Sequence, residues 1–145
     1  MFEDLYQEII MDHASRPRNK GRVETPDAVV HADNPLCGDE LTLSIRKGED
    51  GAIEDIKFEA NACAICMASA SMMTVKAKGR TVEEAKELSS EFVRMLTADE
   101  ETQPERITGE LKVLESVRRF PMRVKCATLG WHALEDSLIE ASKEQ

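Results

Sequence analysis

Four cysteines are the side chains of this sequence best suited to bind a metal or to react, and they are Cys37, Cys63, Cys66 and Cys126. Thiolates are ligands for zinc and for iron–sulfur clusters, and a free thiolate is a strong nucleophile. Cysteines that stay reduced and are scattered along a chain indicate metal or redox chemistry more than disulfide formation. The alternative for any single cysteine is a buried, small apolar side chain.

Cys37 lies in the segment NPLCGDELTL (34–43), and Asp39 follows it two residues later. The asparagine, proline and first glycine of this segment are typical of turns, and the alternation of polar and apolar residues after them predicts a strand. We therefore expect the thiol and the carboxylate to project from a tight turn where a strand starts. Either residue alone could be incidental, but the pair is typical of one half of a metal site.

The other half is expected where two helices begin. Cys63 follows a predicted strand and opens a predicted helix, and Cys126 is expected to open another helix after the break at Pro121. The free N–H groups and the positive end of the helix dipole stabilise a thiolate at such a position. Arg123 and Lys125 add positive charge beside Cys126.

Two zinc sites are chemically sensible, because zinc takes four ligands in a tetrahedron and accepts sulfur, nitrogen or oxygen. One is a closed site of four cysteines, which uses the C-x-x-C pair of Cys63 and Cys66. The other consists of Cys37, Asp39, Cys63 and Cys126, with a carboxylate that is easier to displace. Spacing alone does not choose between them. An iron–sulfur cluster held by the cysteines also remains open, whereas a thioredoxin-like dithiol is disfavoured because no βαβ unit precedes the pair.

The elements that must position these residues are predicted from periodicity. A helix is expected over residues 2–14, followed by an extended, exposed basic loop over 15–27. Alternating apolar residues then predict strands over 28–33, 40–48 and 53–61. Only a short turn (48–51) separates the last two strands, so we expect a three-stranded antiparallel meander.

The second half of the chain is predicted to be helical. Helices are expected over 63–78, over 81–96 after a capping box at Thr81, and over 110–117, with a loop over 97–109. The last helix is expected to start near Lys125 or Cys126 and to end at about Ser142. The fold class is therefore α+β, a small three-stranded antiparallel sheet with helices packed on one face.

Composition limits the classes of protein to which the chain can belong. Its 145 residues suit one domain, spanning 1–145, because domains usually hold about 100–200 residues. The net charge of −9 argues against general nucleic-acid binding, which needs a basic surface. No apolar run approaches the roughly 18 residues that cross a membrane, and the acidic start is unlike a secretory signal. We expect a cytoplasmic protein.

Three segments around the cysteines resemble the U-type iron–sulfur cluster assembly proteins, which have a SufE/NifU-like fold. They are NPLCGDELTL (34–43), ANACAICMASASMM (60–73) and RFPMRVKCATLGWHALED (119–136), and the opening LYQEIIMDHASRPRNKG (5–21) resembles the same family. The resemblance covers nearly the whole chain, and its motifs are specific in combination.

Two features are similar to the zinc-dependent SufU branch of that family. Lys125 stands where the IscU scaffolds carry a histidine, and residues 80–120 form a longer middle segment than theirs. The resemblance implies a zinc site at Cys37, Asp39, Cys63 and Cys126. The SufU branch usually has a serine at the position of Cys66, which favours this set over four cysteines.

The same resemblance implies the function. Cys37 is expected to accept sulfur from the persulfide of a PLP-dependent cysteine desulfurase of the SufS type, and to pass it to an assembly complex of the SufBCD type. Arg123 is a candidate to stabilise the thiolate or persulfide of Cys37. The alternative is a scaffold on which a transient [2Fe–2S] cluster is built, and a third class is a structural zinc module without chemistry.

Overall fold

The computed structural model describes residues 2–98 and 107–143 of the chain. In this part the elements follow one another as α1 (Phe2–Ser15), β1 (Ala28–Asn34), β2 (Asp39–Lys47), β3 (Ile53–Asn61), α2 (Ala64–Ala77), α3 (Val82–Thr97), the 3₁₀ helix η1 (Gly109–Arg119) and α4 (Pro121–Ser142). None of these helices is long and apolar enough to cross a membrane.

The three strands form an antiparallel sheet in the order β1-β2-β3, which confirms the predicted meander. The register pairs Asn34 with Asp39 at one end of β1 and β2, and it pairs Glu40 with Asn61 at the same end of β2 and β3. The beginning of β2 therefore lies beside the ends of both neighbouring strands. Alternate residues of β2 point to the helices and are fully buried, namely Leu41, Leu43 and Ile45.

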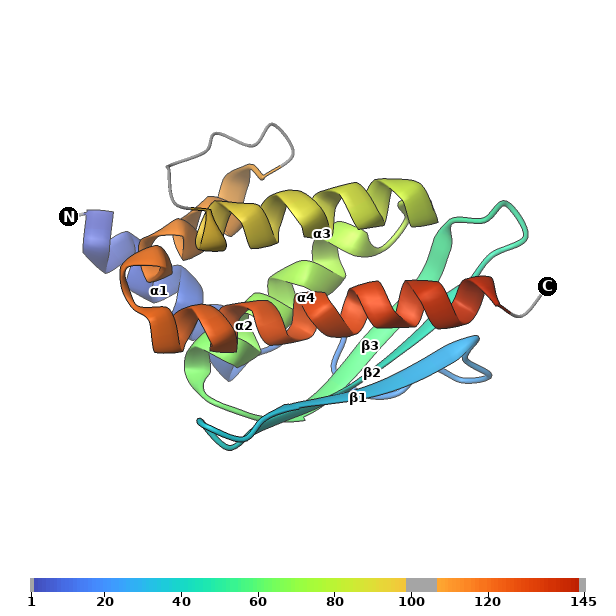
Figure 1. Cartoon of the computed structure of the whole chain (residues 1–145), viewed down its shortest axis with the longest axis horizontal. Helices are drawn as coiled ribbons and strands as arrows, with labels where there is room; N and C mark the ends of the chain where they lie inside the picture. Colours follow the sequence, from blue (N-terminus) through green and yellow to red (C-terminus); the bar gives the residue numbers. More distant parts are fainter. Residues whose placement is uncertain (1, 99–106, 144–145) are drawn as a thin grey trace.

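The helices pack on one face of this sheet, so the α+β prediction is confirmed (Figure 1). Helix α4 contacts β1 and β2, and α2 contacts β3, while α1, α3 and η1 pack against α2, α4 and one another. Where α2 and α4 meet, a Cβ added at Gly130 would lie 3.2 Å from the Cβ of Ala70. The Trp131 indole also donates to the Ser69 hydroxyl (3.0 Å), which donates to the Ala127 carbonyl (2.6 Å). These contacts fix α2 and α4 relative to each other. They thereby also fix Cys63, at the start of α2, relative to Cys126 in α4.

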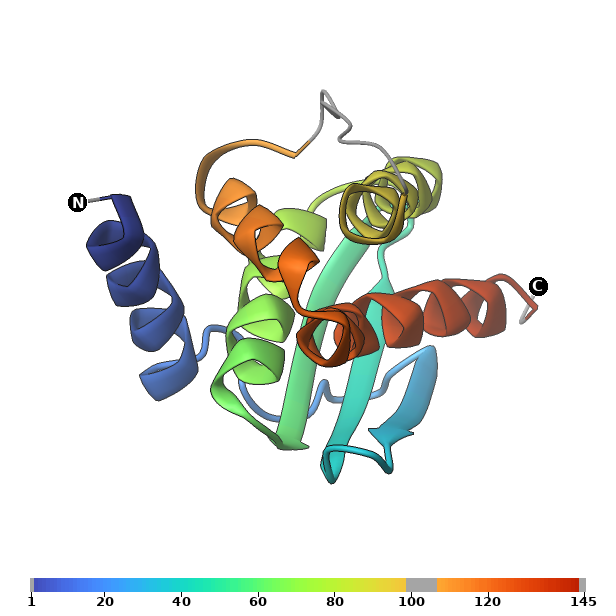
Figure 2. The same cartoon turned by 60° about the vertical axis from the view of Figure 1, so that its left-hand side comes forward.

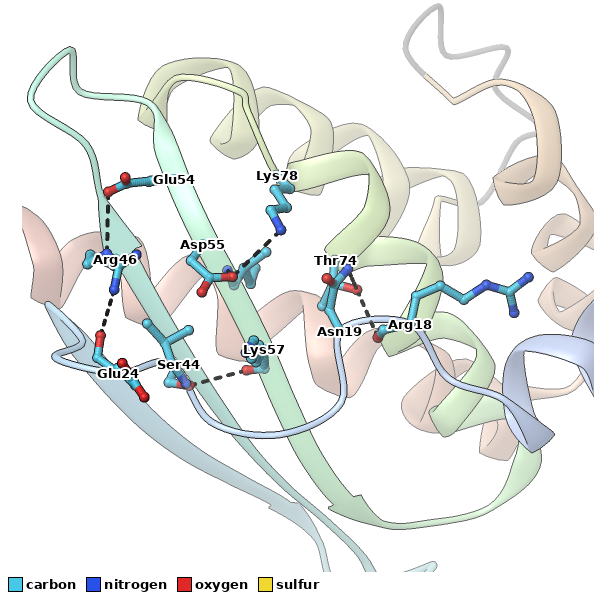
Figure 3. A network of polar contacts seen from close by, with 12 residues as sticks. Arg18, Asn19, Glu24, Ser44, Arg46, Glu54, Asp55, Lys57, Thr74 and Lys78 are labelled. Atoms are coloured by element: carbon cyan, nitrogen blue, oxygen red, sulfur yellow. Dashed lines mark hydrogen bonds and ion pairs between the residues drawn. The ribbon is translucent and has the colours of Figure 1, made fainter.

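The basic loop between α1 and β1 follows an extended path, as predicted, but it is attached to the sheet (Figure 3). Gly21 donates its N–H to Phe58 of β3 (2.8 Å), and Phe58 donates to the Asn19 carbonyl (3.0 Å). The Val23 N–H is bonded to the Ser44 hydroxyl on the side of β2 away from the helices (2.9 Å). Val23 is buried as a result, and the loop covers part of the second face of the sheet.

Two helix predictions need correction. The segment 110–117 lies in a 3₁₀ helix, and α4 begins at Pro121 rather than near Lys125 or Cys126. Proline is favoured in the first turn of a helix, where its missing N–H has no partner to lose, so Pro121 starts the helix that it was expected to precede. The capping box at Thr81 is confirmed, because Thr81 and Glu84 exchange hydrogen bonds. The expected loop over 97–109 lies mostly outside the described residues.

Candidate metal centre

Three parts of the fold meet at the end of the sheet where β2 begins: the β1–β2 turn, the start of α2 and the first half of α4 (Figures 1 and 2). The ligand atoms of Cys37, Asp39 and Cys126 lie within 4.8 Å of one another. Cys63 joins them through Asp39, since its Sγ lies 4.0 Å from the Asp39 Oδ2. Of the four ligands that the family resemblance implied, the structure places three in one close group and the fourth, Cys63, beside Asp39.

The turn that carries Cys37 is built on Asn34. The Asn34 carbonyl accepts hydrogen bonds from the N–H groups of Cys37 (3.2 Å) and Gly38 (2.9 Å), and its side-chain Oδ1 accepts from Leu36 (3.3 Å). Gly38 has a φ of +74°, a left-handed conformation that glycine adopts without strain. Cys37 is exposed at this turn. Its thiol is therefore within reach of a partner protein.

Asp39 is buried, with 1% of its surface exposed, and it connects the sheet to α2. Its Oδ1 accepts a hydrogen bond from the N–H of Cys63 (2.9 Å), the N-cap residue of that helix, whose own side chain makes no capping bond. A carboxylate at this end of a helix is stabilised by the helix dipole. The sequence predicted that a strand and a helix start at these two residues, but it gave no signal for the bond between them.

Cys126 lies in the second turn of α4, so its predicted place at a helix N-terminus is wrong. It is 1% exposed, and its Sγ is 3.5 Å from the Sγ of Cys37 and 3.5 Å from the Met122 carbonyl. Burial raises the pKa of the Cys126 thiol, and its hydrogen bonds to Asp39, Cys37 and Cys63 act in the same direction. A bound cation would oppose both effects, because it stabilises the thiolate.

Cys66 stands apart from the four residues of the centre. It is buried, with 1% of its surface exposed, and it lies on α2 one turn after Cys63. Burial, followed by the negative charges of Asp39, Cys63 and Cys37, raises the pKa of the Cys66 thiol to about 12. Within residues 2–98 and 107–143, the close group of ligand atoms contains neither Cys66 nor Cys63, but the Cys63 Sγ contacts Asp39 at 4.0 Å.

Arg123 lies one turn before Cys126 on α4 and is exposed. It lines a groove of about 710 Å³, whose wall also includes Ala64 and Ile65 at the start of α2 and Phe120 at the start of α4. Because Ala64 follows Cys63, this groove adjoins the centre. In the part of the chain that the structure describes, the Arg123 guanidinium has no hydrogen-bond or ion-pair partner.

The donor set fits zinc. Three thiols and one carboxylate are donors that zinc accepts, and ligand atoms around a tetrahedral ion with bonds of about 2.0–2.3 Å lie about 3.3–3.8 Å apart. The 3.5 Å between the sulfurs of Cys37 and Cys126 falls in that range. Cys63 Sγ lies 4.0 Å from Asp39 Oδ2 but outside the group of atoms within 4.8 Å of one another, so it would have to move closer to complete the tetrahedron.

Comparison with known proteins identifies the family. The NifU-like N terminal domain matches residues 5–137. The chain belongs to the NifU-like N-terminal domain family. The zinc-dependent sulfurtransferase SufU of Bacillus subtilis is 44% identical over 133 residues, 92% of this chain and 88% of that protein. The iron–sulfur cluster assembly scaffold protein IscU of Streptococcus pyogenes is 38% identical over 141 residues, 97% of this chain and 87% of that protein.

Solved structures of the family share the fold. The crystal structure of a SufU protein from Fervidobacterium islandicum, described as a scaffold protein for the SUF system, aligns with a TM-score of 0.82 at 35% identity and covers 90% of this chain and 94% of that one. A NifU-like protein from Brucella abortus aligns with a TM-score of 0.84 at 28% identity, over 99% and 98% of the two chains. The predicted resemblance to the U-type assembly proteins is confirmed.

Proposed function

We propose that this protein is a zinc-dependent sulfur acceptor in iron–sulfur cluster assembly. It takes sulfane sulfur from the persulfide of a PLP-dependent cysteine desulfurase of the SufS type and passes it to an assembly complex of the SufBCD type. The observation that supports this best is an exposed thiol, Cys37, on a tight turn 3.5 Å from the buried thiol of Cys126. The 44% identity to a zinc-dependent sulfurtransferase points to the same activity.

The residues that would hold the zinc ion are Cys37, Asp39, Cys63 and Cys126. When bound, the ion supplies positive charge that keeps the cysteines deprotonated at neutral pH. Asp39 has a second role that does not depend on metal, since its bond to the Cys63 N–H holds the start of α2 against the start of β2. The turn residues present Cys37 to the solvent, and α4 holds Cys126 in the interior.

The sulfur transfer is a thiol–persulfide exchange. The Cys37 thiolate attacks the terminal sulfur of the partner's persulfide, and a new S–S bond forms on Cys37 as the partner's S–S bond breaks. The electron pair of the broken bond leaves on the partner's cysteine, so the sulfane sulfur keeps its oxidation level and no external oxidant is needed. An exposed position suits Cys37 because the partner's persulfide must reach it.

Arg123 is proposed to stabilise the anionic sulfur of Cys37 during this exchange. Its guanidinium is exposed, adjoins the centre and has no partner among the described residues, so it is free to approach an anion. We expect Arg123→Ala to lower sulfur uptake by about tenfold, as one charge-assisted hydrogen bond would. Arg119→Ala is the matched control, because Arg119 lines the same groove from η1 and lies farther along the chain from Cys126.

The deciding experiment measures zinc, iron and acid-labile sulfide per chain in protein purified without added metal. Desulfurase turnover is then followed with the wild type, Cys37→Ala and, as a matched cysteine control, Cys66→Ser. We expect one zinc, no sulfide, and stimulation of turnover that Cys37→Ala abolishes and Cys66→Ser retains. Iron and sulfide in equal amounts, without an effect on turnover, would overturn the proposal in favour of the scaffold function named for the IscU relatives.

A further inference from the structure

The side chain of Asn34 contains a buried hydrogen-bond donor without a partner. Asn34 is 7% exposed, and its Oδ1 accepts from the Leu36 N–H, which directs the Nδ2 group away from that bond. Among the residues that the structure describes, this Nδ2 is the one buried side-chain nitrogen or oxygen that lacks a hydrogen-bond partner. Such a group destabilises a folded protein, so its retention calls for an explanation.

The position of Asn34 places this donor beside the metal centre. Asn34 pairs with Asp39 in the β1–β2 ladder, and residues directly opposite each other on neighbouring strands project from the same face of a sheet. The Asp39 carboxylate on that face belongs to the close group of ligand atoms. The Asn34 carbonyl also closes the turn by accepting a hydrogen bond from the Cys37 N–H (3.2 Å). Asn34 and Cys37 are therefore the first and last residues of one four-residue turn.

We propose that the Asn34 amide is a positioning residue that donates a hydrogen bond to the sulfur atom carried by Cys37. The inference rests on the proposed function, which supplies this cargo. A persulfide extends about 2.05 Å beyond the cysteine Sγ, and its anion accepts hydrogen bonds more strongly than a neutral thiol. The donor is thus without a partner in the sulfur-free protein because its acceptor arrives with the transferred sulfur.

Two substitutions at Asn34 separate the donor from the turn. Asn34→Asp keeps the Oδ1 that accepts from Leu36 and removes the N–H donor, whereas Asn34→Ala removes the donor without adding charge. Asn61→Asp is the matched control for charge, because Asn61 is exposed at the same end of the sheet. Cys37→Ala gives the background from sulfur on other cysteines.

The test loads zinc-bearing protein with inorganic polysulfide, so that no desulfurase is needed. The polysulfide gives one sulfane sulfur to the Cys37 thiolate and leaves shortened by one sulfur, which conserves atoms and electrons. After removal of the excess, the Cys37 persulfide is followed by peptide mass spectrometry in a fixed concentration of dithiothreitol. We expect its lifetime to fall about tenfold in both Asn34 variants and to stay unchanged in Asn61→Asp.

A spectroscopic readout distinguishes positioning from a structural role. An amide hydrogen bond stabilises the anion, so the near-ultraviolet band of the persulfide anion should appear at lower pH in the wild type than in Asn34→Ala. Equal lifetimes and equal bands in wild type and variants would overturn the inference and leave the proposed function standing. A shortened lifetime in Asn34→Asp alone would assign the effect to charge and also overturn it. Failure of wild-type Cys37 to take up sulfur would overturn both proposals.

Discussion

The two turns at the opposite ends of β2 use similar backbone chemistry for different purposes. Each contains a glycine in the left-handed region, Gly38 with a φ of +74° and Gly51 with a φ of +83°. Each is also closed by backbone hydrogen bonds, with Asn34 as the acceptor in the first and Gly48 as an acceptor in the second. The two turns differ in how many of the polar groups in and beside them form hydrogen bonds or ion pairs with the rest of the protein.

The turn over 48–52 is attached to its surroundings. Ile53, which follows it, donates to the Arg80 carbonyl (2.8 Å) and accepts from Gly79 (2.8 Å), so the hairpin is bonded to the link between α2 and α3. Lys78 adds an ion pair to Asp55 at 3.7 Å (Figure 3). The turn before Asp39 instead exposes Cys37 and leaves the Asn34 amide unpaired. The contrast indicates that the turn over 48–52 is a structural connection, whereas the turn before Asp39 holds groups available for a reaction.

The largest expected difference between the two turns at the ends of β2 is in metal binding. Asp39→Ala removes a proposed ligand, and we expect zinc affinity to fall at least about 100-fold, the upper end of what loss of a supporting residue causes. It also leaves the half-buried Cys63 N–H without this partner, which should lower the free energy of unfolding by about 1 kcal/mol. Competition with a chromophoric chelator measures the affinity, and urea denaturation measures the stability.

Asp50→Ala is the matched control at the far turn. Asp50 also accepts a backbone hydrogen bond, from Ala52 (3.1 Å), but it is exposed. We expect unchanged zinc affinity and a stability change within about 0.5 kcal/mol. Wild-type affinity in Asp39→Ala would show that Asp39 is not a ligand and would favour the closed site of four cysteines.

A smaller effect is expected from placing alanine at either turn glycine. A Cβ at Gly38 or Gly51 would meet no atom within 4 Å, so only the left-handed backbone is strained. Both substitutions should therefore lower the free energy of unfolding by about 1–2 kcal/mol. Only Gly38→Ala should also slow sulfur transfer to Cys37, by about tenfold, because it moves the reacting thiol. Urea denaturation and desulfurase turnover check the two parts, and equal turnover in both variants would contradict the contrast between the turns.

The periodicity of the sequence was sufficient to predict the sheet and most helices. Alternating residues in β2 place Leu41 and Leu43 against the helices, and the Thr81 capping box marks the start of α3. Local signals that have two meanings were less reliable. Pro121 was interpreted as a break before the last helix, whereas it occupies the first turn of that helix.

Local sequence patterns could not predict contacts between residues that lie far apart in the chain. The bond from the Cys63 N–H to Asp39 joins residues 24 positions apart, and the loop that was expected to be exposed is bonded to β3 through Gly21. The cysteines were candidate ligands because of their chemistry and local context, but spacing left two ligand sets open, and only the family resemblance favoured Asp39 over Cys66. Asn34 was recognised only as a turn residue, since no pattern in the sequence shows that its amide is buried and unpaired.

The smallest expected effect concerns Cys66, in the interior at the Cys37 end of the molecule. Burial raises its pKa from the ordinary 9.0 to about 12, so the folded protein holds this proton more tightly than the unfolded chain does. As pH rises above about 9, the unfolded state loses the proton first, and the free energy of unfolding falls until the folded thiol also titrates near 12. One such group contributes at most about 1.4 kcal/mol per pH unit.

Because serine does not titrate there, Cys66→Ser should show a shallower decline than the wild type when metal-free protein is unfolded with urea between about pH 9 and 11. Parallel slopes in the two proteins would mean that this thiol ionises alike in the folded and unfolded states, and that the interior at this end of the sheet is more accessible to water than its burial indicates.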